Sequence, residues 1–128
     1  MRREPIVQYN PPMDTVIETR TGWMIRCRCR TEGWHEFSKV GRPNATWTFN
    51  GNMVKPTFSP SMNELCNGPG THHHPEYPTT RCHFTVTDGR IQYHGDCTHD
   101  LKGQTLDLEP WPEATVRSYK ASKEAEGW

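Results

Sequence analysis

The chain has 128 residues, 15 acidic and 15 basic side chains, and a mean hydropathy of −0.92. A neutral chain has no overall field to attract nucleic acid or a membrane surface, and no apolar run is long enough to span a bilayer. The length predicts one domain, and with only 32% hydrophobic residues the core is lean enough to benefit from a structural metal ion.

The cysteine content points to a reducing compartment. Five cysteines are an odd number, which suits a disulfide framework poorly, and the N-terminus lacks the apolar core of a signal peptide. We therefore expect a cytoplasmic protein whose clustered cysteines and histidines are metal ligands or buried thiols.

The N-terminal third reads as an extended arm and edge strand over residues 1–21, followed by two paired strands. From Gly22 the residues alternate between an apolar and a basic face, and residues 34–37 are expected to return as the partner strand. Cys27 and Cys29 share the apolar face. On the return strand, His35 and Phe37 share one face. The basic face carries Arg26, Arg28 and Arg30.

Short elements and loops are expected in the middle of the chain. Residues 47–49 form a short aromatic strand before an Asn-Gly turn. Residues 55–61 contain two prolines, which remove ladder donors, so this stretch is predicted to be an ordered extended loop rather than a central strand. Residues 64–80 are predicted to be a long surface loop, with the three histidines at 72–74 exposed to solvent.

A β-hairpin is the clearest element. Asp88-Gly89 suits a type I′ turn, and the flanking runs are rich in Thr, Val, Ile and aromatic residues. Alternation places His83 and His94 opposite each other on the polar face, while Cys97 and His99 continue the parity of the apolar face. The apolar face of the hairpin holds Cys82, Phe84, Val86, Ile91 and Tyr93.

The overall prediction is a mainly β fold: a small antiparallel domain, either a sandwich or a partly open barrel, with a short C-terminal helix. A last strand is expected near residues 104–108, and Pro112-Glu113 opens a helix that runs to about residue 125. This divides the chain into the arm and edge strand over 1–21, a zinc-binding β domain over 22–112, and a helix or tail over 113–128.

Six residues are candidate metal ligands. Structural zinc takes four thiolate or imidazole ligands in a tetrahedron. The preferred set takes Cys27 and Cys29 from one β element and Cys82 and Cys97 from the other, with His99 or His35 able to replace one thiol. The alternative is that these cysteines are ordinary buried thiols of the core.

A second group of residues suggests recognition. The loop around Phe58, Ser59 and Ser61 offers hydroxyls on a rigid backbone, and Trp47 adds an aromatic surface. No Gly-x-Ser-x-Gly elbow surrounds these serines, so no catalytic residue is assigned. The stripe of Arg26 and Arg28 could meet phosphate or an acidic partner, although pairing with Asp and Glu on a solvated face is the default.

Five blocks of sequence, in order, carry a resemblance to a known family. They are WTFNG at 47–51, PTFSPS at 56–61, CHF at 82–84, DGRIQY at 88–93 and DCTH at 96–99. Across about residues 22–112 the chain resembles a family of small phage, prophage and bacterial proteins of unknown function, some labelled ammonia monooxygenase. The resemblance implies a small β-rich, zinc-containing domain. It departs from the family's usual Cys-x-x-Cys-Gly knuckle, because here the cysteines have one intervening residue.

Two classes of function follow from these features. The favoured one is a phage or prophage accessory protein with structural zinc that binds an unidentified protein, for example a host defence component. The other is a zinc hydrolase with an open metal position and Glu36, Asp96 or Asp100 as general base. A nucleic-acid binder acting through the arginine stripe is the weakest reading.

Overall fold

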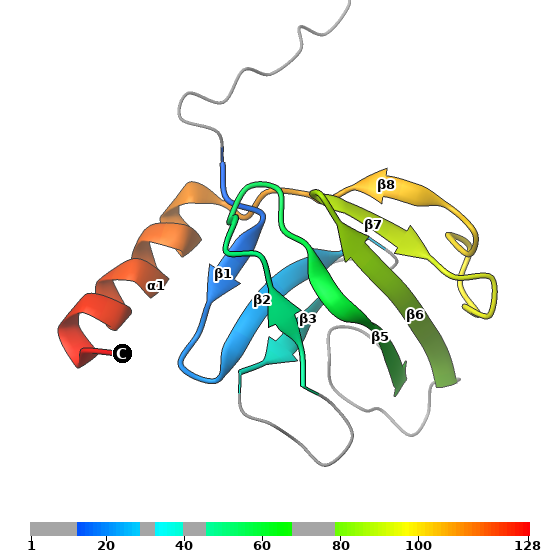
Figure 1. Cartoon of the computed structure of the whole chain (residues 1–128), viewed down its shortest axis with the longest axis horizontal. Coiled ribbons are helices and arrows are strands. Elements are labelled where there is room, and N and C mark those ends of the chain that lie inside the picture. The colour runs from blue at the N-terminus through cyan, green and yellow to red at the C-terminus, as the bar shows by residue number, and fades with distance from the viewer. Residues whose placement is uncertain (1–12, 29–32, 40–45, 68–78) are drawn as a thin grey trace, which may run out of the picture.

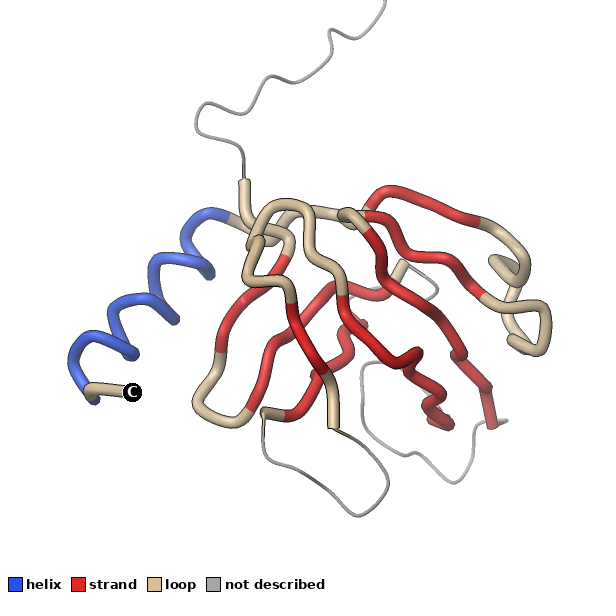
Figure 2. Tube along the Cα trace, in the orientation of Figure 1, coloured by secondary structure: helices blue, strands red, loops and turns tan. Residues whose placement is uncertain are grey.

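The computed structural model describes residues 13–28, 33–39, 46–67 and 79–128. These residues form two antiparallel sheets and one helix, as expected from the sequence (Figure 1). The three-stranded sheet has the order β1-β2-β3, and the five-stranded sheet has the order β4-β5-β6-β7-β8. The two sheets are not closed into a barrel (Figure 2). Buried side chains from both sheets form one core cluster.

The three-stranded sheet follows the predicted pattern. It contains β1 (Val16–Glu18), β2 (Gly22–Cys27) and β3 (Gly33–Ser38). Ile25 pairs with His35 and Cys27 with Gly33, so the alternation of β2 brings Ile25 and Cys27 to the buried side. The face of β2 that carries Arg26 is partly covered by Trp111, whose indole N–H donates to the carbonyl of Met24.

The five-stranded sheet is built around the predicted hairpin. Its strands are β4 (Thr48–Phe49), β5 (Phe58–Asn67), β6 (Thr79–Thr87), β7 (Arg90–Tyr93) and β8 (Thr105–Asp107). Asp88 and Gly89 have positive φ angles of 50° and 78°, as a type I′ turn requires. Thr87 pairs with Arg90 and Phe84 with Tyr93, which confirms the predicted register.

The middle of the chain departs from its prediction. The stretch expected to be a loop between Lys55 and Ser61 leads into β5, a ten-residue strand that lies between β4 and β6. Pro60 is tolerated because the β5–β6 register shifts between Phe58 and Met62, and proline is accepted where a bulge interrupts the ladder. Both ends of the stretch predicted to be a loop over residues 64–80 belong to strands, since β5 reaches Asn67 and β6 begins at Thr79. The histidines at 72–74 lie outside the described residues.

The core is a stack of aromatic rings between the sheets. The ring centroids of Phe37 in β3 and Phe58 in β5 are 4.0 Å apart, and their planes differ by 5°. Phe49 stacks on the other side of Phe58, with a centroid distance of 4.6 Å. The predicted inward residues of the hairpin, Phe84, Val86, Ile91 and Tyr93, are all at most 1% exposed.

The helix α1 (Glu113–Glu126) lies beside β1 and confirms the predicted C-terminal helix (Figure 1). None of its residues is buried, and ion pairs link it to β1 and to the turn that follows β1. Lys123 contacts Glu18 at 2.6 Å, and Arg20 pairs with Glu126. No described helix combines the length and apolar character needed to cross a bilayer.

Candidate functional site

Two groups of polar side chains lie on opposite faces of β6. Alternation along this strand turns Cys82 and Phe84 toward the core and His83 and Thr85 toward the outer face of the sheet. The inner group contains thiols and an imidazole, and the outer group contains a hydroxyl, imidazoles and a carboxylate.

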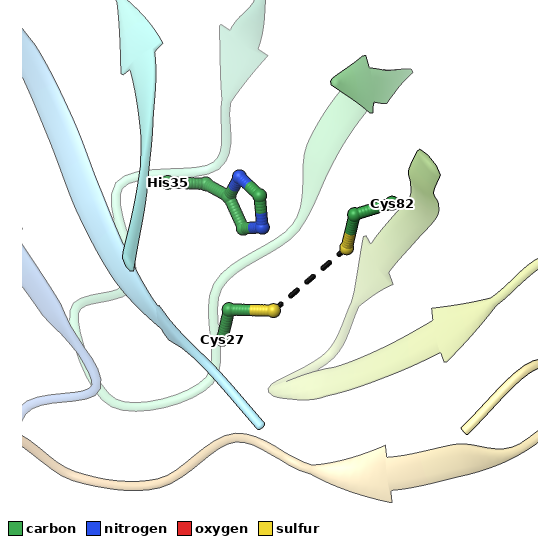
Figure 3. Close-up of side chains that lie close together, drawn as sticks. All are labelled: Cys27, His35 and Cys82. Atoms are coloured by element: carbon green, nitrogen blue, oxygen red, sulfur yellow. Dashed lines mark hydrogen bonds between the residues drawn. The ribbon is translucent and has the colours of Figure 1, made fainter. Parts of the chain in front are cut away.

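The inner group joins three elements that are far apart in sequence. Cys27 ends β2, His35 lies in β3 and Cys82 lies in β6, and one donor atom from each lies within 4.8 Å of the others (Figure 3). The Sγ atoms of Cys27 and Cys82 are 3.7 Å apart, well beyond the length of an S–S bond. All three residues are at most 3% exposed. We call this set the Cys-His-Cys cluster.

The surroundings of His35 resemble those of a metal-binding histidine. Its Nδ1 contacts the carboxylate of Glu64 on β5. Metal-ligating histidines commonly donate one ring N–H to a carboxylate, which fixes the tautomer and leaves the other ring nitrogen to face the ion. Two thiols and one imidazole are ligands that zinc accepts. The Cys-His-Cys cluster can therefore hold a metal ion.

The Cys-His-Cys cluster thus brings together three of the six candidate ligands. Two of the others, Cys97 and His99, have different contacts. Cys97 contacts the main chain of His83, with its Sγ 3.3 Å from the nitrogen and 3.1 Å from the oxygen. His99 packs edge-on against Tyr93, and its Nδ1 accepts the N–H of Leu101. The strand β7 ends at Tyr93, but Cys97 beyond it is 4% exposed and belongs to the core, as its parity predicted. Cys29 lies outside the described residues.

The outer group forms a hydrogen-bonded row across three segments. Ser61 Oγ of β5 lies 3.2 Å from Nε2 of His83, and Nδ1 of His83 lies 2.9 and 3.0 Å from the two carboxylate oxygens of Asp96. Asp96 comes from the turn that follows β7. We call Ser61, His83 and Asp96 the outer triad.

The irregular pairing of β5 brings Ser61 to this row. Phe58 pairs with Val86 and Met62 with Phe84, so β5 has three residues where β6 has only one, Thr85. Ser61 is the last of the three and stands next to inward-facing Met62, which turns its hydroxyl to the outer face. The indole N–H of Trp47 also reaches the carbonyl of Ser61 at 3.4 Å.

The turn that carries Asp96 is tied to β6 on both sides of His83. The N–H of His94 donates to the carbonyl of His83 at 2.8 Å, and the N–H of Thr98 donates to the carbonyl of Arg81 at 3.2 Å. The thiol of Cys97 binds the main chain of His83 between these two links. Asp96 is therefore positioned by main-chain and thiol contacts as well as by its own side chain.

The electrostatics of the outer triad favour one arrangement of protons. The hydrogen bond with His83 lowers the pKa of Asp96 below its ordinary value, and the charge of Arg81 acts in the same direction. Ionised Asp96 accepts the Nδ1–H of His83, which leaves a lone pair on Nε2 facing the hydroxyl of Ser61. In this state Ser61 can lose its proton to His83 when it attacks an electrophile.

The remaining predicted binding residues have other surroundings. Phe58 is 1% exposed and belongs to the aromatic core, whereas Ser59 is exposed. Arg26 and Arg28 both pair with Glu109, at 3.5 and 3.3 Å. The arginine stripe is thus paired with an acidic residue, in line with its default interpretation.

Sequence reasoning named each member of the outer triad without joining them. Ser61 was expected in a binding loop, His83 in a pair with His94, and Asp96 as one of three possible bases for a zinc enzyme. The missing element was β5, because Pro56 just before it and Pro60 within it argued against a strand. A triad is recognised by geometry and not by an elbow motif, and the useful signal was a Ser, a His and an Asp in three neighbouring sequence blocks.

A family model described as "Bacterial ubiquitination-like system serine protease (BubE)" matches residues 4–94. The chain belongs to the BubE family. The match includes Ser61 and His83 and ends two residues before Asp96. Comparison with curated proteins and with solved structures found no match. The BubE match gives a bacterial family and does not support the phage or prophage naming expected from the sequence.

Proposed function

We propose that this protein is a serine peptidase with Ser61 as nucleophile, His83 as general base and Asp96 as the residue that orients His83. The observation that carries the proposal is the continuous row of contacts from Ser61 Oγ through both nitrogens of His83 to Asp96. The description of the BubE family as serine proteases supports it independently.

The proposed reaction follows from the positions of the protons. His83 Nε2 takes the proton of Ser61 as Oγ attacks the carbonyl carbon of a peptide bond. The tetrahedral intermediate collapses, the C–N bond breaks, and His83 gives the proton to the leaving amine. Water then attacks the acyl-enzyme ester with His83 again acting as base, which releases the acid product and restores Ser61.

The partner in this proposal is a protein substrate. The family description places its members in a bacterial ubiquitination-like system, so a protein of such a system is the substrate class we propose. The expected protein-binding role is compatible with this, because a peptidase must engage a protein. Phage origin and a host defence target have no observation here that favours them. We also propose a cytoplasmic location, where the thiols of Cys27 and Cys82 stay reduced.

We further propose that the Cys-His-Cys cluster binds zinc in a structural role. The support is its donor set and the contact of His35 with Glu64. A zinc hydrolase fits these residues poorly: the three ligands are at most 3% exposed, so a substrate has no direct access to the ion. Two thiolates also suit a closed site better than one that activates water.

The peptidase proposal is tested by labelling with a fluorophosphonate, a reagent that phosphonylates activated serines. We expect one adduct, located on Ser61 by peptide mass spectrometry. Ser61→Ala and His83→Ala should abolish labelling. Ser59→Ala is the matched control, because Ser59 is an exposed serine of the same strand and should leave labelling unchanged. Absence of an adduct in the folded wild-type protein would refute the proposal.

A further inference from the structure

A second imidazole lies against the base of the outer triad. The rings of His83 and His94 have centroids 4.2 Å apart and planes 12° apart, so they are stacked face to face. The hairpin explains this arrangement, because the pairing of β6 with β7 is extended by the hydrogen bond from His94 N–H to the carbonyl of His83. Both side chains therefore stand on the outer face of the sheet.

His94 is itself held in place from the other side. Its Nε2 lies 2.7 Å from Oγ1 of Thr85, the next outward-facing residue of β6 after His83. The main chain and the far ring nitrogen of His94 are thus both bound to β6. The flat face of the His94 ring is therefore held in a fixed position against the ring of His83.

From these contacts we infer that His94 is a positioning residue for the proposed peptidase: its ring fixes the plane of the His83 imidazole. The inference rests on the peptidase proposal. His83 must direct Nε2 at Ser61 and Nδ1 at Asp96 at the same time, and rotation of its ring would lengthen both contacts. Small misplacements of a catalytic group are costly, since reacting atoms must meet at near-attack distance.

Stacking against His94 matters because the side chain of His83 is not fully buried. Its side chain is 23% exposed, and Asp96 is 53% exposed. A hydrogen bond to an exposed carboxylate holds a ring less firmly than packing in a core does, so a stacked neighbour adds restraint where burial does not. His94 contacts neither Ser61 nor Asp96 in any described interaction, which is why we assign it positioning and not catalysis.

The competing interpretation is a plain surface pair, in which two imidazoles pack without consequence for Ser61. The two interpretations differ in what they require at position 94. Positioning requires a flat ring that can stack, whereas a surface pair tolerates any residue that keeps the fold.

Three variants separate these interpretations. His94→Phe keeps a flat ring, and His94→Leu fills similar space without a ring. His94→Ala removes the side chain that stacks on His83. The readout is fluorophosphonate labelling of Ser61, resolved into the maximal rate and the half-saturating concentration. We expect Leu and Ala to lower the maximal rate about tenfold or more, with the half-saturating concentration and melting temperature unchanged. Phe should stay within about twofold of wild type.

Each outcome is decisive. Wild-type rates for His94→Leu would overturn the positioning role, and so would a His94→Phe protein as slow as His94→Leu. If His94→Ala fails to fold, the comparison of Phe with Leu still decides. A folded wild-type protein that is not labelled at all refutes the peptidase proposal itself, and the positioning role falls with it. If the wild-type protein is labelled and all three variants react at the wild-type rate, the positioning role alone is refuted.

Discussion

The two faces of β6 place two histidine-centred groups back to back. On the inner face His35 is 1% exposed and lies among thiols, which suits a permanently held ion. On the outer face His83 is partly exposed and lies between a hydroxyl and a carboxylate, which suits repeated proton transfer. Adjacent residues of one strand, Cys82 and His83, thus belong to separate groups of side chains. Strand alternation can therefore keep two polar groups on opposite faces of a sheet at a spacing of one residue.

Preventing the proposed binding of zinc to the Cys-His-Cys cluster should have the largest effect. Structural zinc contributes an apparent binding free energy of about 10–16 kcal/mol that is coupled to folding. We expect about one equivalent of zinc by elemental analysis, and a strong fall in melting temperature with a chelator or in Cys82→Ser. Gln92→Ala, on the exposed outer face, is the control and should melt like wild type. Less than about half an equivalent of zinc, with an unchanged melting curve in chelator, would contradict the metal site.

Asp96→Asn should affect the outer face alone. An amide at this position would no longer hold the Nδ1–H tautomer of His83, and the comparable change in a well-studied serine protease costs about 10⁴-fold in rate. We expect labelling of Ser61 to slow by about 10³–10⁴-fold while the zinc content stays the same. Asp100→Asn, in an exposed position of the following turn, is the matched control. Loss of zinc in Asp96→Asn would show that the two faces are not insulated.

A third change tests the inner face away from the proposed ligands. Ile91 is 0% exposed and pairs with Val86 within the core. Ile91→Ala should lower the free energy of unfolding by about 2–5 kcal/mol, because it removes buried methyl groups and leaves a cavity. Denaturant titration measures this. The zinc content and the position of the labelled serine should not change, and a cost near zero would place Ile91 outside the tightly packed core.

The smallest expected effect is a pH dependence from the outer face. The hydrogen bond with His83 lowers the pKa of Asp96. A depressed carboxyl pKa stabilises the fold above the ordinary value of about 3.9, and this stabilisation is lost as the pH falls through the lowered pKa. The melting temperature of wild type minus that of Asp96→Asn should therefore shrink as the pH falls below about pH 4. A difference that stays constant into strong acid would contradict the lowered pKa.

The sequence predicted those parts of the molecule in which local chemistry decides the structure. Asp88-Gly89 sets the turn, the turn sets the register, and the register turns Cys82 inward and His83 outward. Parity also predicted that Cys27 faces the core. These features depend on a period of two residues and a two-residue turn, both of which can be read from a short stretch.

The sequence did not predict features that depend on contacts between distant segments. Pro60 forbids a regular central strand, and only the pairing partner shows that an irregularity accommodates it. Without β5 nothing placed Ser61 beside His83. Past Tyr93 the parity still predicted the burial of Cys97, but it did not predict that the strand ends there and that the following turn brings Asp96 beside His83. The outer triad depends on this turn and on the irregular pairing of β5.

The irregular pairing of β5 has a consequence for how such a protein can change over generations. β5 carries two more residues than β6 between Phe58 and Met62. An even number of extra residues preserves which side chains face inward, so a deletion of two would restore a continuous ladder and leave Phe58 and Met62 in the core. The same deletion could remove Ser61 or draw it away from His83. The proposed nucleophile could therefore be lost while the inward-facing residues on both sides of it keep their places in the core.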